Sequence, residues 1–546
     1  MRKALLFSLL ALAASPVAAQ SFRVQCPGST TLHTADLSPA YTGPSTTFRT
    51  VTRGDGSTIS VPYTDNGGGI KCQQISGGDG FVTMGDGVQT YLFGFGPLSG
   101  LLDMASGLPG TQPASLFNVD SSLYLDSIFI GAPIDQASRN LTTGTYSITG
   151  GYSFNGAIGM VPDPESVPTP GALSGHVDPR LIMDVGVMNA NQPAPMMAID
   201  EDDEFFLTLT NVGQIMRPDL FEQHTVHFHG YPNASSFYDG VPDASIAINI
   251  GGSFTYYYLA PDAGTYFWHW HISPPEHLQM GMVGQLYVRP RQNRVPPSMT
   301  LYAALQAQQT DLRTASNCAS DVLCSSPLPA AGDNSTSGGF VGGVATKKYA
   351  YNDGDGSTRY DVEYPIQMMG FDPNFHFVGM TFNPESFADM KDKYFMLNGR
   401  SYPDTVYPGV MTTQSTDGTL HASQPVPTII NIPAGGRALL RISDLNVTEY
   451  HTLASLGIPM RVIAVNARLL RDTAGNDMTY VTNSITLGGG ESLDVILDAT
   501  GYAAGQKFYL YTPQLDHLSN DAENFGGMMT EINICNAVDP TTKACS

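Results

Sequence analysis

The amino-acid sequence predicts an all-β protein made of two β-sandwich domains. Its 546 residues include 57 glycines and 38 prolines but only 26 lysines and arginines. Short runs rich in β-branched and aromatic residues recur between turn residues, whereas long stretches of helical periodicity are scarce. A chain of this length exceeds what one hydrophobic core accommodates, so we expect more than one domain.

The N-terminus predicts a secretory signal peptide over residues 1–19. Arg2 and Lys3 precede a short apolar run at 4–14, and the small residues at 17–19 match the pattern that signal peptidase cleaves. The apolar run is too short to span a bilayer. We therefore expect cleavage after Ala19 and an exported protein, periplasmic or extracellular.

The chain is acidic, with a formal net charge of −23 at pH 7. Such a charge argues against nucleic acid or an anionic membrane as a partner, because both are negatively charged. We expect no membrane insertion, since no stretch after the leader approaches the length of a membrane helix.

Six cysteines make up an even count, which in an oxidising compartment predicts disulfides. Local pairing is the simplest of the fifteen possible connectivities. The local pairs are Cys26–Cys72, Cys318–Cys324 and Cys535–Cys545.

Strand signals are concentrated in two regions, which we interpret as two domains. The first region, 75–290, follows an N-terminal extension at 20–74 and contains a Gly-, Ser- and Pro-rich insertion at about 100–180. We expect it to form a compact antiparallel sandwich. Its expected elements are a hairpin at 79–87 and strands at 89–95, 204–211, 224–229, 253–259, 265–271 and 282–288.

The second region, 298–546, follows a linker at 290–297. Residues 314–347 are rich in Ala, Ser and Gly, and we expect a loop there. Expected strands, each bounded by turn residues, lie at 428–431, 438–442, 460–465 and 492–497.

Six of the twelve histidines fall between positions 224 and 277. His227 and His229 are two residues apart, and so are His269 and His271. Side chains two apart on a strand lie on the same face, roughly 7 Å apart. Two such strands side by side would bring four imidazoles together, which suits copper or zinc. Packing does not require this pattern, so a metal site is favoured over ordinary structural histidines.

Other possible ligands flank these two pairs. His224 precedes the first pair and His277 follows the second. Met282 comes next and offers a thioether, a ligand that suits copper, although a buried Met at the start of a strand is equally typical of a core.

These residues resemble the first cupredoxin domain of the multicopper oxidase family. HTVHFHG at 224–230 matches the family's H-x-x-H-x-H-G, and 238–271 contains its D-G-V-P turn and its G-T-Y-x-W-H-x-H strand. A weaker resemblance continues through 392–405 and 435–446. The resemblance as a whole covers roughly 75–100 and 185–535, and it implies two cupredoxin-like Greek-key domains.

The resemblance implies copper as the cofactor and assigns roles to the histidines. His227, His229, His269 and His271 fall on ligands of the family's trinuclear site, which reduces O2. His224, His277 and Met282 fall on its type 1 site, but Trp270 stands where that site has its cysteine.

The closing segment, 509–534, resembles the family's terminal copper-binding segment without its H-x-H. Thr512 and Gln514 stand in that neighbourhood, and His517 with Met528 remains suggestive of copper. His451 opens another stretch where the family places ligands. One chain thus supplies only part of the trinuclear ligand set.

Three functions are expected from these features. The first is an oxidoreductase that uses a His-rich copper centre, with O2 as acceptor and an undefined small molecule or metal ion as reductant. A homo-oligomer would be one way to complete its cluster. The second is a non-catalytic copper protein for binding, storage or resistance. The third is a structural protein that keeps the oxidase fold without its activity. The intact His pairs disfavour this function.

Overall fold

The computed structural model describes most of the chain from residue 69 onward. Several predicted features lie outside the described residues. They are the signal peptide, the Cys318–Cys324 pair and most of the expected insertion at 100–180 and of the expected loop at 314–347. The described residues are 26–27, 30, 33, 48–52, 58–62, 69–104, 107–117, 129–130, 137–139, 146–148, 186–230, 236–260, 262–295, 300–308, 328–329, 340–341, 344–345, 348–378, 386–414, 418, 420–540 and 542–546.

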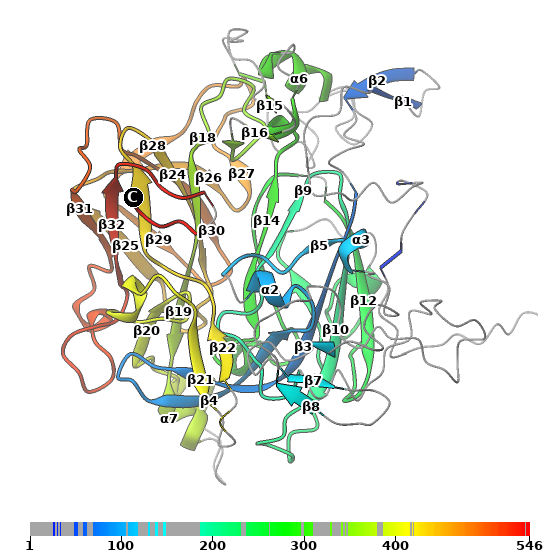
Figure 1. Cartoon of the computed structure of the whole chain (residues 1–546), viewed down its shortest axis with the longest axis vertical. Coiled ribbons are helices and arrows are strands. Elements are labelled where there is room, and N and C mark those ends of the chain that lie inside the picture. Colours follow the sequence, from blue (N-terminus) through cyan, green and yellow to red (C-terminus); the bar gives the residue numbers. More distant parts are fainter. Residues whose placement is uncertain are drawn as a thin grey trace, which may run out of the picture.

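Two β-sandwiches lie side by side (Figure 1), which confirms the predicted all-β class and the two sandwich domains. The first sandwich consists of two sheets. One contains, in spatial order, β12 (Ser253–Leu259), β10 (Glu204–Gly213), β3 (Ile70–Thr83) and β4 (Gln89–Pro97), with β5 (Gln112–Pro113) also on β3. The other contains β11 (His227–Phe228), β13 (Gly264–His269), β14 (Val283–Arg289) and β9 (Met197–Asp200).

The second sandwich also consists of two sheets. The larger contains β20 (Tyr394–Leu397), β19 (Val362–Phe371), β24 (Arg437–Asp444), β30 (Ser492–Asp498), β26 (Met460–Val465) and β27 (Arg468–Leu469), with β28 (Tyr480–Thr482) on β26. The smaller contains β23 (Ile430–Pro433), β32 (Met529–Cys535), β31 (Lys507–Tyr511), β25 (His451–Leu456) and β29 (Ser484–Leu487).

The remaining elements are short. No helix among the described residues has the length and hydrophobicity that a membrane crossing requires. The helices are α2 (Leu101–Met104), α3 (Ala114–Phe117), α5 (Pro274–Gln279), α6 (Leu301–Gln308), α7 (Pro373–Val378), and the 3-10 turns η2 (Ser236–Tyr238), η3 (Arg291–Arg294), η6 (Phe387–Asp389), η7 (Asp404–Val406) and η8 (Leu515–Leu518). The minor strands are β1 (Phe48–Thr52), β2 (Thr58–Pro62), β6 (Phe129–Ile130), β7 (Ala137–Arg139), β8 (Tyr146–Ile148), β15 (Phe340–Val341), β16 (Val344–Ala345), β17 (Lys348–Tyr349), β18 (Arg359–Tyr360), β21 (Met411–Gln414) and β22 (Leu420–Gln424).

The expectation of a purely antiparallel first sandwich is wrong. β3 pairs in parallel with β10, and β9 pairs in parallel with β14. The second sandwich has the parallel pairs β19–β24 and β23–β32. Each pair joins strands that are far apart in the sequence, and a long connection is what parallel pairing requires.

The strand expected at 224–229 is shorter in the structure. Only His227 and Phe228 belong to β11, whereas His224 makes an isolated bridge to Ile248. The strands expected at 253–259 and 460–465 are found with those bounds. β3 begins at Ile70, before the predicted domain start at 75.

Two of the predicted disulfides are confirmed. Cys26–Cys72 fastens an N-terminal segment to β3, and Cys535–Cys545 ties the end of β32 to the C-terminal residues.

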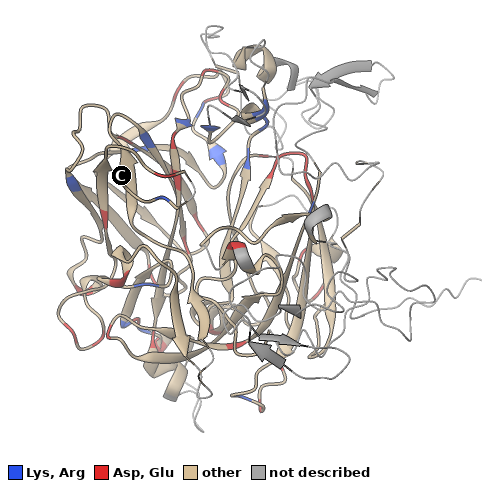
Figure 2. Cartoon of the chain, in the orientation of Figure 1, with Lys and Arg blue, Asp and Glu red and all other residues tan. Residues whose placement is uncertain are grey.

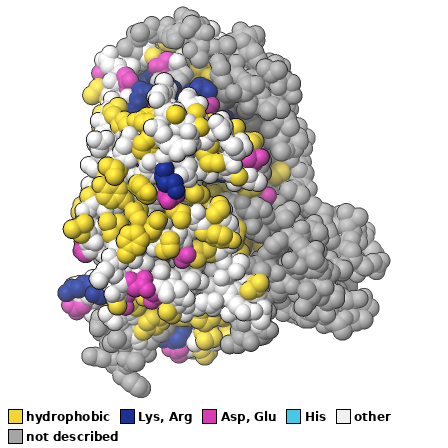
Figure 3. Space-filling model, turned by 60° about the vertical axis from the view of Figure 1, so that its left-hand side comes forward, with side chains coloured by type: hydrophobic (Ala, Val, Ile, Leu, Met, Phe, Trp, Pro, Cys, Tyr) yellow, Lys and Arg dark blue, Asp and Glu magenta, His cyan; other side chains and the backbone are white. Residues whose placement is uncertain are grey.

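Hydrophobic side chains cover much of one outer face. Figure 3 brings forward the side on which β25, β31 and β32 lie in Figure 1, and charged side chains are few there. Exposed large hydrophobic residues of this sandwich include Leu456 on β25 and Tyr480 and Val481 on β28. The acidic excess of the chain is therefore not gathered on this face.

A buried ion network joins the two sandwiches, although Lys and Arg are sparse on the described chain (Figure 2). On β24, Arg441 is fully buried and pairs with Glu363 at 3.1 Å. Its guanidinium also donates to Thr265 of β13 at 3.2 Å. Arg289 of β14 pairs with the same carboxylate at 3.1 Å. Burial would raise the pKa of Glu363, but the two arginines outweigh it and hold that pKa far below its usual range.

We predict that Arg441→Met lowers the free energy of unfolding by about 3–5 kcal/mol, because it removes one partner from a buried charge network. The measurement is urea-induced unfolding at pH 7.

Arg437→Met is the matched control, because Arg437 lies on the same strand and its pair with Asp498 is partly exposed. Its expected cost is about 1 kcal/mol or less. Equal costs for the two substitutions would contradict the structural role given to Arg441.

Candidate metal centre

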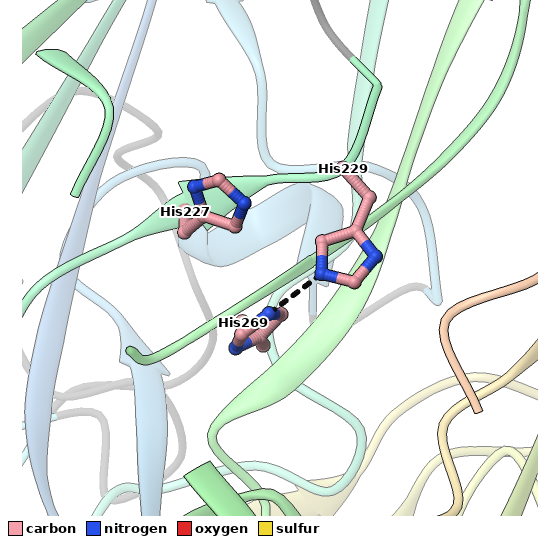
Figure 4. A group of neighbouring side chains, drawn as sticks. All are labelled: His227, His229 and His269. Carbon is pink, nitrogen blue, oxygen red and sulfur yellow. Dashed lines mark hydrogen bonds between the residues drawn. The ribbon is translucent and has the colours of Figure 1, made fainter. Parts of the chain in front are cut away.

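Three imidazoles meet where β11 pairs with β13. The register places His227 directly opposite His269, and the H-x-H spacing brings His229 to the same place. One ring nitrogen from each of these histidines lies within 4.8 Å of the other two (Figure 4). The convergence expected from the spacing is therefore present for three of the four paired histidines.

The outer nitrogen of each ring is held by the backbone. His227 Nδ1 lies 2.7 Å from the carbonyl of Asp239, and His269 Nδ1 contacts that of Trp270. The Nδ1 edge of His229 faces Gly490, with whose backbone the ring forms a hydrogen bond. Carbonyls only accept, so Nδ1 of His227 and of His269 carries the proton and Nε2 of each keeps its lone pair.

The inner nitrogens are close together. His229 Nε2 and His269 Nε2 lie 2.7 Å apart (Figure 4). Two lone pairs at this separation repel each other unless a proton or a cation lies with them. This crowding of soft nitrogen donors fits a copper or zinc ion.

Electrostatics keep the rings of His229 and His269 neutral. Burial, reinforced by the neighbouring His227, lowers the pKa of His229 to about 4. Burial and the nearby His229 hold the pKa of His269 well below 6.5. A neutral imidazole is the form that binds a metal, so both rings are ready to act as ligands at neutral pH.

His271 lies beside this group. Its ring centroid is 4.9 Å from that of His227 and 5.3 Å from that of His269. The three-histidine group does not include it, so its assignment as a ligand stays a prediction.

A glycine turn positions the backbone beside His227. Gly240 has φ +80°, and a Cβ there would lie 1.9 Å from the carbonyl oxygen of Val226. Only glycine fits this close approach. The turn lets the carbonyl of Asp239 reach His227, which explains the D-G-V-P segment.

The centre borders a cavity of about 660 Å³ between the sandwiches. His229 and His269 line it from the first sandwich. The second sandwich contributes residues 446–450 and the glycine-rich 488–491. That Glu449 and Gly490 line this cavity was not predicted from the sequence. The run of three glycines at 488–490 could have indicated Gly490.

Trp270 fills the position where the sequence suggested a second copper site. Its indole stacks on His277 with ring centroids 3.4 Å apart. Its Nε1 donates to His224 Nδ1 at 3.1 Å. Burial lowers the pKa of His224 to about 3, so this ring is a neutral acceptor.

The other suggested ligands at this position are also engaged. His277 contacts the carbonyl of Ser273 through Nδ1 and the carboxylate of Glu222 through Nε2. Met282 is buried in the core, and its backbone carbonyl accepts the N–H of Trp270 at 3.0 Å. This donor set does not fit a metal ion as it stands, and these ligand assignments stay predictions.

Comparison with known proteins finds similarity in the region that carries the centre. A family model described as Multicopper oxidase matches residues 176–293. The chain is 33% identical to Multicopper oxidase MCE of Talaromyces pinophilus over 120 residues, which are 22% of this chain and 18% of that protein. It is 31% identical to L-ascorbate oxidase of Cucumis sativus over 116 residues, which are 20% of this chain and 18% of that protein.

Among solved structures, Blue Copper Oxidase from Nitrosomonas europaea aligns with 63% of this chain and 77% of its own, at 21% identity and a TM-score of 0.40. The match to curated relatives spans less than a fifth of their length. Residues 176–293 are thus similar to the multicopper oxidase family, and this similarity implies copper as the cofactor.

Proposed function

We propose that this protein is a copper oxidoreductase whose metal is held by His227, His229 and His269, with O2 as the electron acceptor. One observation carries the proposal: three imidazoles converge, and two of them, those of His229 and His269, line a cavity between the two sandwiches. The similarity of residues 176–293 to multicopper oxidases supports it.

The protein's own residues would bind and orient the metal. The carbonyls of Asp239 and Trp270 and the backbone at Gly490 fix the three rings with their lone pairs inward. Copper, when bound, supplies one-electron redox chemistry. Binding it would leave the outer contacts of His227 and His269 in place, because these engage the nitrogens that face away from the metal.

The cavity beside the centre gives a reductant room to approach. Its lining is mixed, with His229 and His269 on one wall and Glu449 and Glu491 on the other. Trp270 provides no thiolate to relay electrons from a distant site. We therefore propose that the reductant, a small molecule or metal ion, binds in this cavity.

A second candidate is copper binding without turnover, for storage or resistance. The observation that favours it is Trp270, which fills the position of an electron-accepting copper site. This candidate uses the same three histidines and differs only in that bound copper does not turn over.

Copper loading with oxygen uptake separates the two candidates. With an aminophenol or Cu(I) as reductant, the oxidoreductase consumes O2, whereas a storage protein binds copper without consuming O2. His229→Asn and His269→Asn should each weaken copper binding by at least about tenfold, since each removes a ligand.

The control is His376→Gln, which changes a buried histidine that stacks on Phe371, away from the three-histidine group. It should retain copper. If both ligand variants bound copper like the wild type, the proposed centre would be ruled out.

Gly490→Ala tests the contribution of the second sandwich. Gly490 has φ +88°, and a Cβ there would lie 2.9 Å from His229 Nδ1. We expect the substitution to displace this ring and to lower copper affinity several-fold, as measured by competition with a chelator.

Gly501→Ala is the matched control, because Gly501 has the same φ of +88° with no atom within 4 Å of the added Cβ. Both variants carry the same backbone strain, so only Gly490→Ala should lose copper. Equal losses would point to general destabilisation instead.

We also propose that the protein is exported, to the periplasm or beyond the cell. The disulfides Cys26–Cys72 and Cys535–Cys545 support this, because such bonds persist in oxidising compartments. The residues at 17–19 supply the cleavage pattern. Mass spectrometry of the protein from the exported fraction should find Gln20 at its N-terminus, and an uncleaved N-terminus on cytosolic protein would refute export.

A further inference from the structure

We propose that a second cavity between the sandwiches, separate from the three-histidine centre, binds a small organic carboxylate with an apolar body. This cavity has a volume of about 270 Å³. Among the described residues, none lines both this cavity and the one beside His229 and His269. The site goes beyond the proposed function and does not depend on it.

The walls of this second cavity come from both sandwiches and from the C-terminal residues. β14 of the first sandwich contributes Tyr287 and Arg289, and β19 of the second contributes Glu363. Residues 542–544 also line the cavity. The disulfide Cys535–Cys545 ties these residues to the end of β32, so this wall is held in place by a covalent bond.

The second cavity is cationic, although the chain as a whole is acidic. Three cations, Arg289, Lys348 and Lys543, line it with one carboxylate, that of Glu363. This carboxylate is already shared, because Arg289 and the buried Arg441 each pair with it at 3.1 Å. Among the described residues, neither Lys348 nor Lys543 has an ion-pair partner within 4.0 Å. Positive charge is therefore in excess around the cavity.

The cations of the second cavity repel one another. Burial lowers the pKa of Lys543, and Lys348 and Arg289 lower it further, whereas Glu363 and Asp539 act in the opposite direction. Like charges gathered away from bulk water are costly unless an opposite charge lies among them. A bound anion would supply that opposite charge.

Hydrogen-bond donors remain for a carboxylate. In the part of the chain that the structure describes, the guanidinium of Arg289 makes one hydrogen bond, from Nη2 to Glu363 at 3.1 Å. A guanidinium has five N–H donors, and each lysine ammonium has three. Charge-assisted hydrogen bonds from such groups are the strong ones that carboxylates accept. Arg289, Lys348 and Lys543 are thus suited to hold a carboxylate.

Apolar surface makes up much of the remaining lining, which favours an organic anion over an inorganic one. Tyr287, Tyr364 and Met196 lie there together with Pro365 and Pro427. A cavity of about 150 Å³ is large enough for benzene, so about 270 Å³ accommodates one ring with a carboxylate. An inorganic ion would leave these walls in contact with water, whereas an apolar body would cover them.

Isothermal titration calorimetry of the full chain with benzoate tests this site. We expect one benzoate per chain, with the same affinity in copper-loaded and copper-free protein, because the two cavities are separate. Benzyl alcohol, a neutral analogue, should bind at least about tenfold more weakly, since it lacks the charge. Inorganic phosphate should also bind more weakly, and phosphate binding as tight as that of benzoate would contradict the apolar body.

Lys348→Met and Lys543→Met should each weaken benzoate binding at least about fivefold, because each removes a cation and keeps an apolar stem. Benzoate should also raise the melting temperature of the wild type more than that of Lys543→Met.

Lys507→Met is the matched control. Lys507 is an exposed lysine on β31 that pairs with Glu531 at 2.7 Å and does not line the second cavity. Its benzoate affinity should stay within about twofold of the wild type. Absence of benzoate binding to the wild type, or equal affinities of Lys543→Met and Lys507→Met, would overturn the proposal. Neither outcome would bear on copper at the three-histidine centre.

Discussion

The pairing of β11 with β13 is the constraint on which the centre depends. It sets His227 opposite His269, and a slip of β11 by one residue would turn the His227 side chain to the other face of the sheet. β11 is only two residues long, so it cannot fix this register alone. β13 is held by its pairing with β14 and by a hydrogen bond of 2.6 Å from Thr265 to Asp494 of the second sandwich.

The second sandwich therefore acts on the centre in two ways. Its buried ion network, centred on Arg441, contacts Thr265 of β13, the strand that carries His269. Its glycine-rich turn brings Gly490 against His229 and closes the cavity. The centre thus depends on both sandwiches, although its nitrogen donors come from the first.

The sequence predicted the features that arise from short-range pattern. The H-x-H spacing indicated the convergence of His227, His229 and His269, and turn residues bounded strands such as β12 and β26. The parallel pair β3–β10 was not predictable, because it joins strands separated by a long stretch without clear pattern. Glu449 was missed for a similar reason, since only the tertiary fold brings it to the cavity that His229 lines.

Trp270 fills the position where the sequence predicted a second copper site. The neighbouring His224 and His277 remain, but His224 accepts a hydrogen bond from the indole and His277 stacks on it, instead of facing a metal. Redox chemistry would then rest on the three-histidine centre. Anomalous X-ray scattering at the copper edge, from crystals of the copper-loaded protein, tests this most directly. We predict a copper peak at about 2.0 Å from the Nε2 atoms of His227, His229 and His269. A peak between His224 and His277 with Trp270 displaced, and none at the three histidines, would contradict a centre built on those three rings.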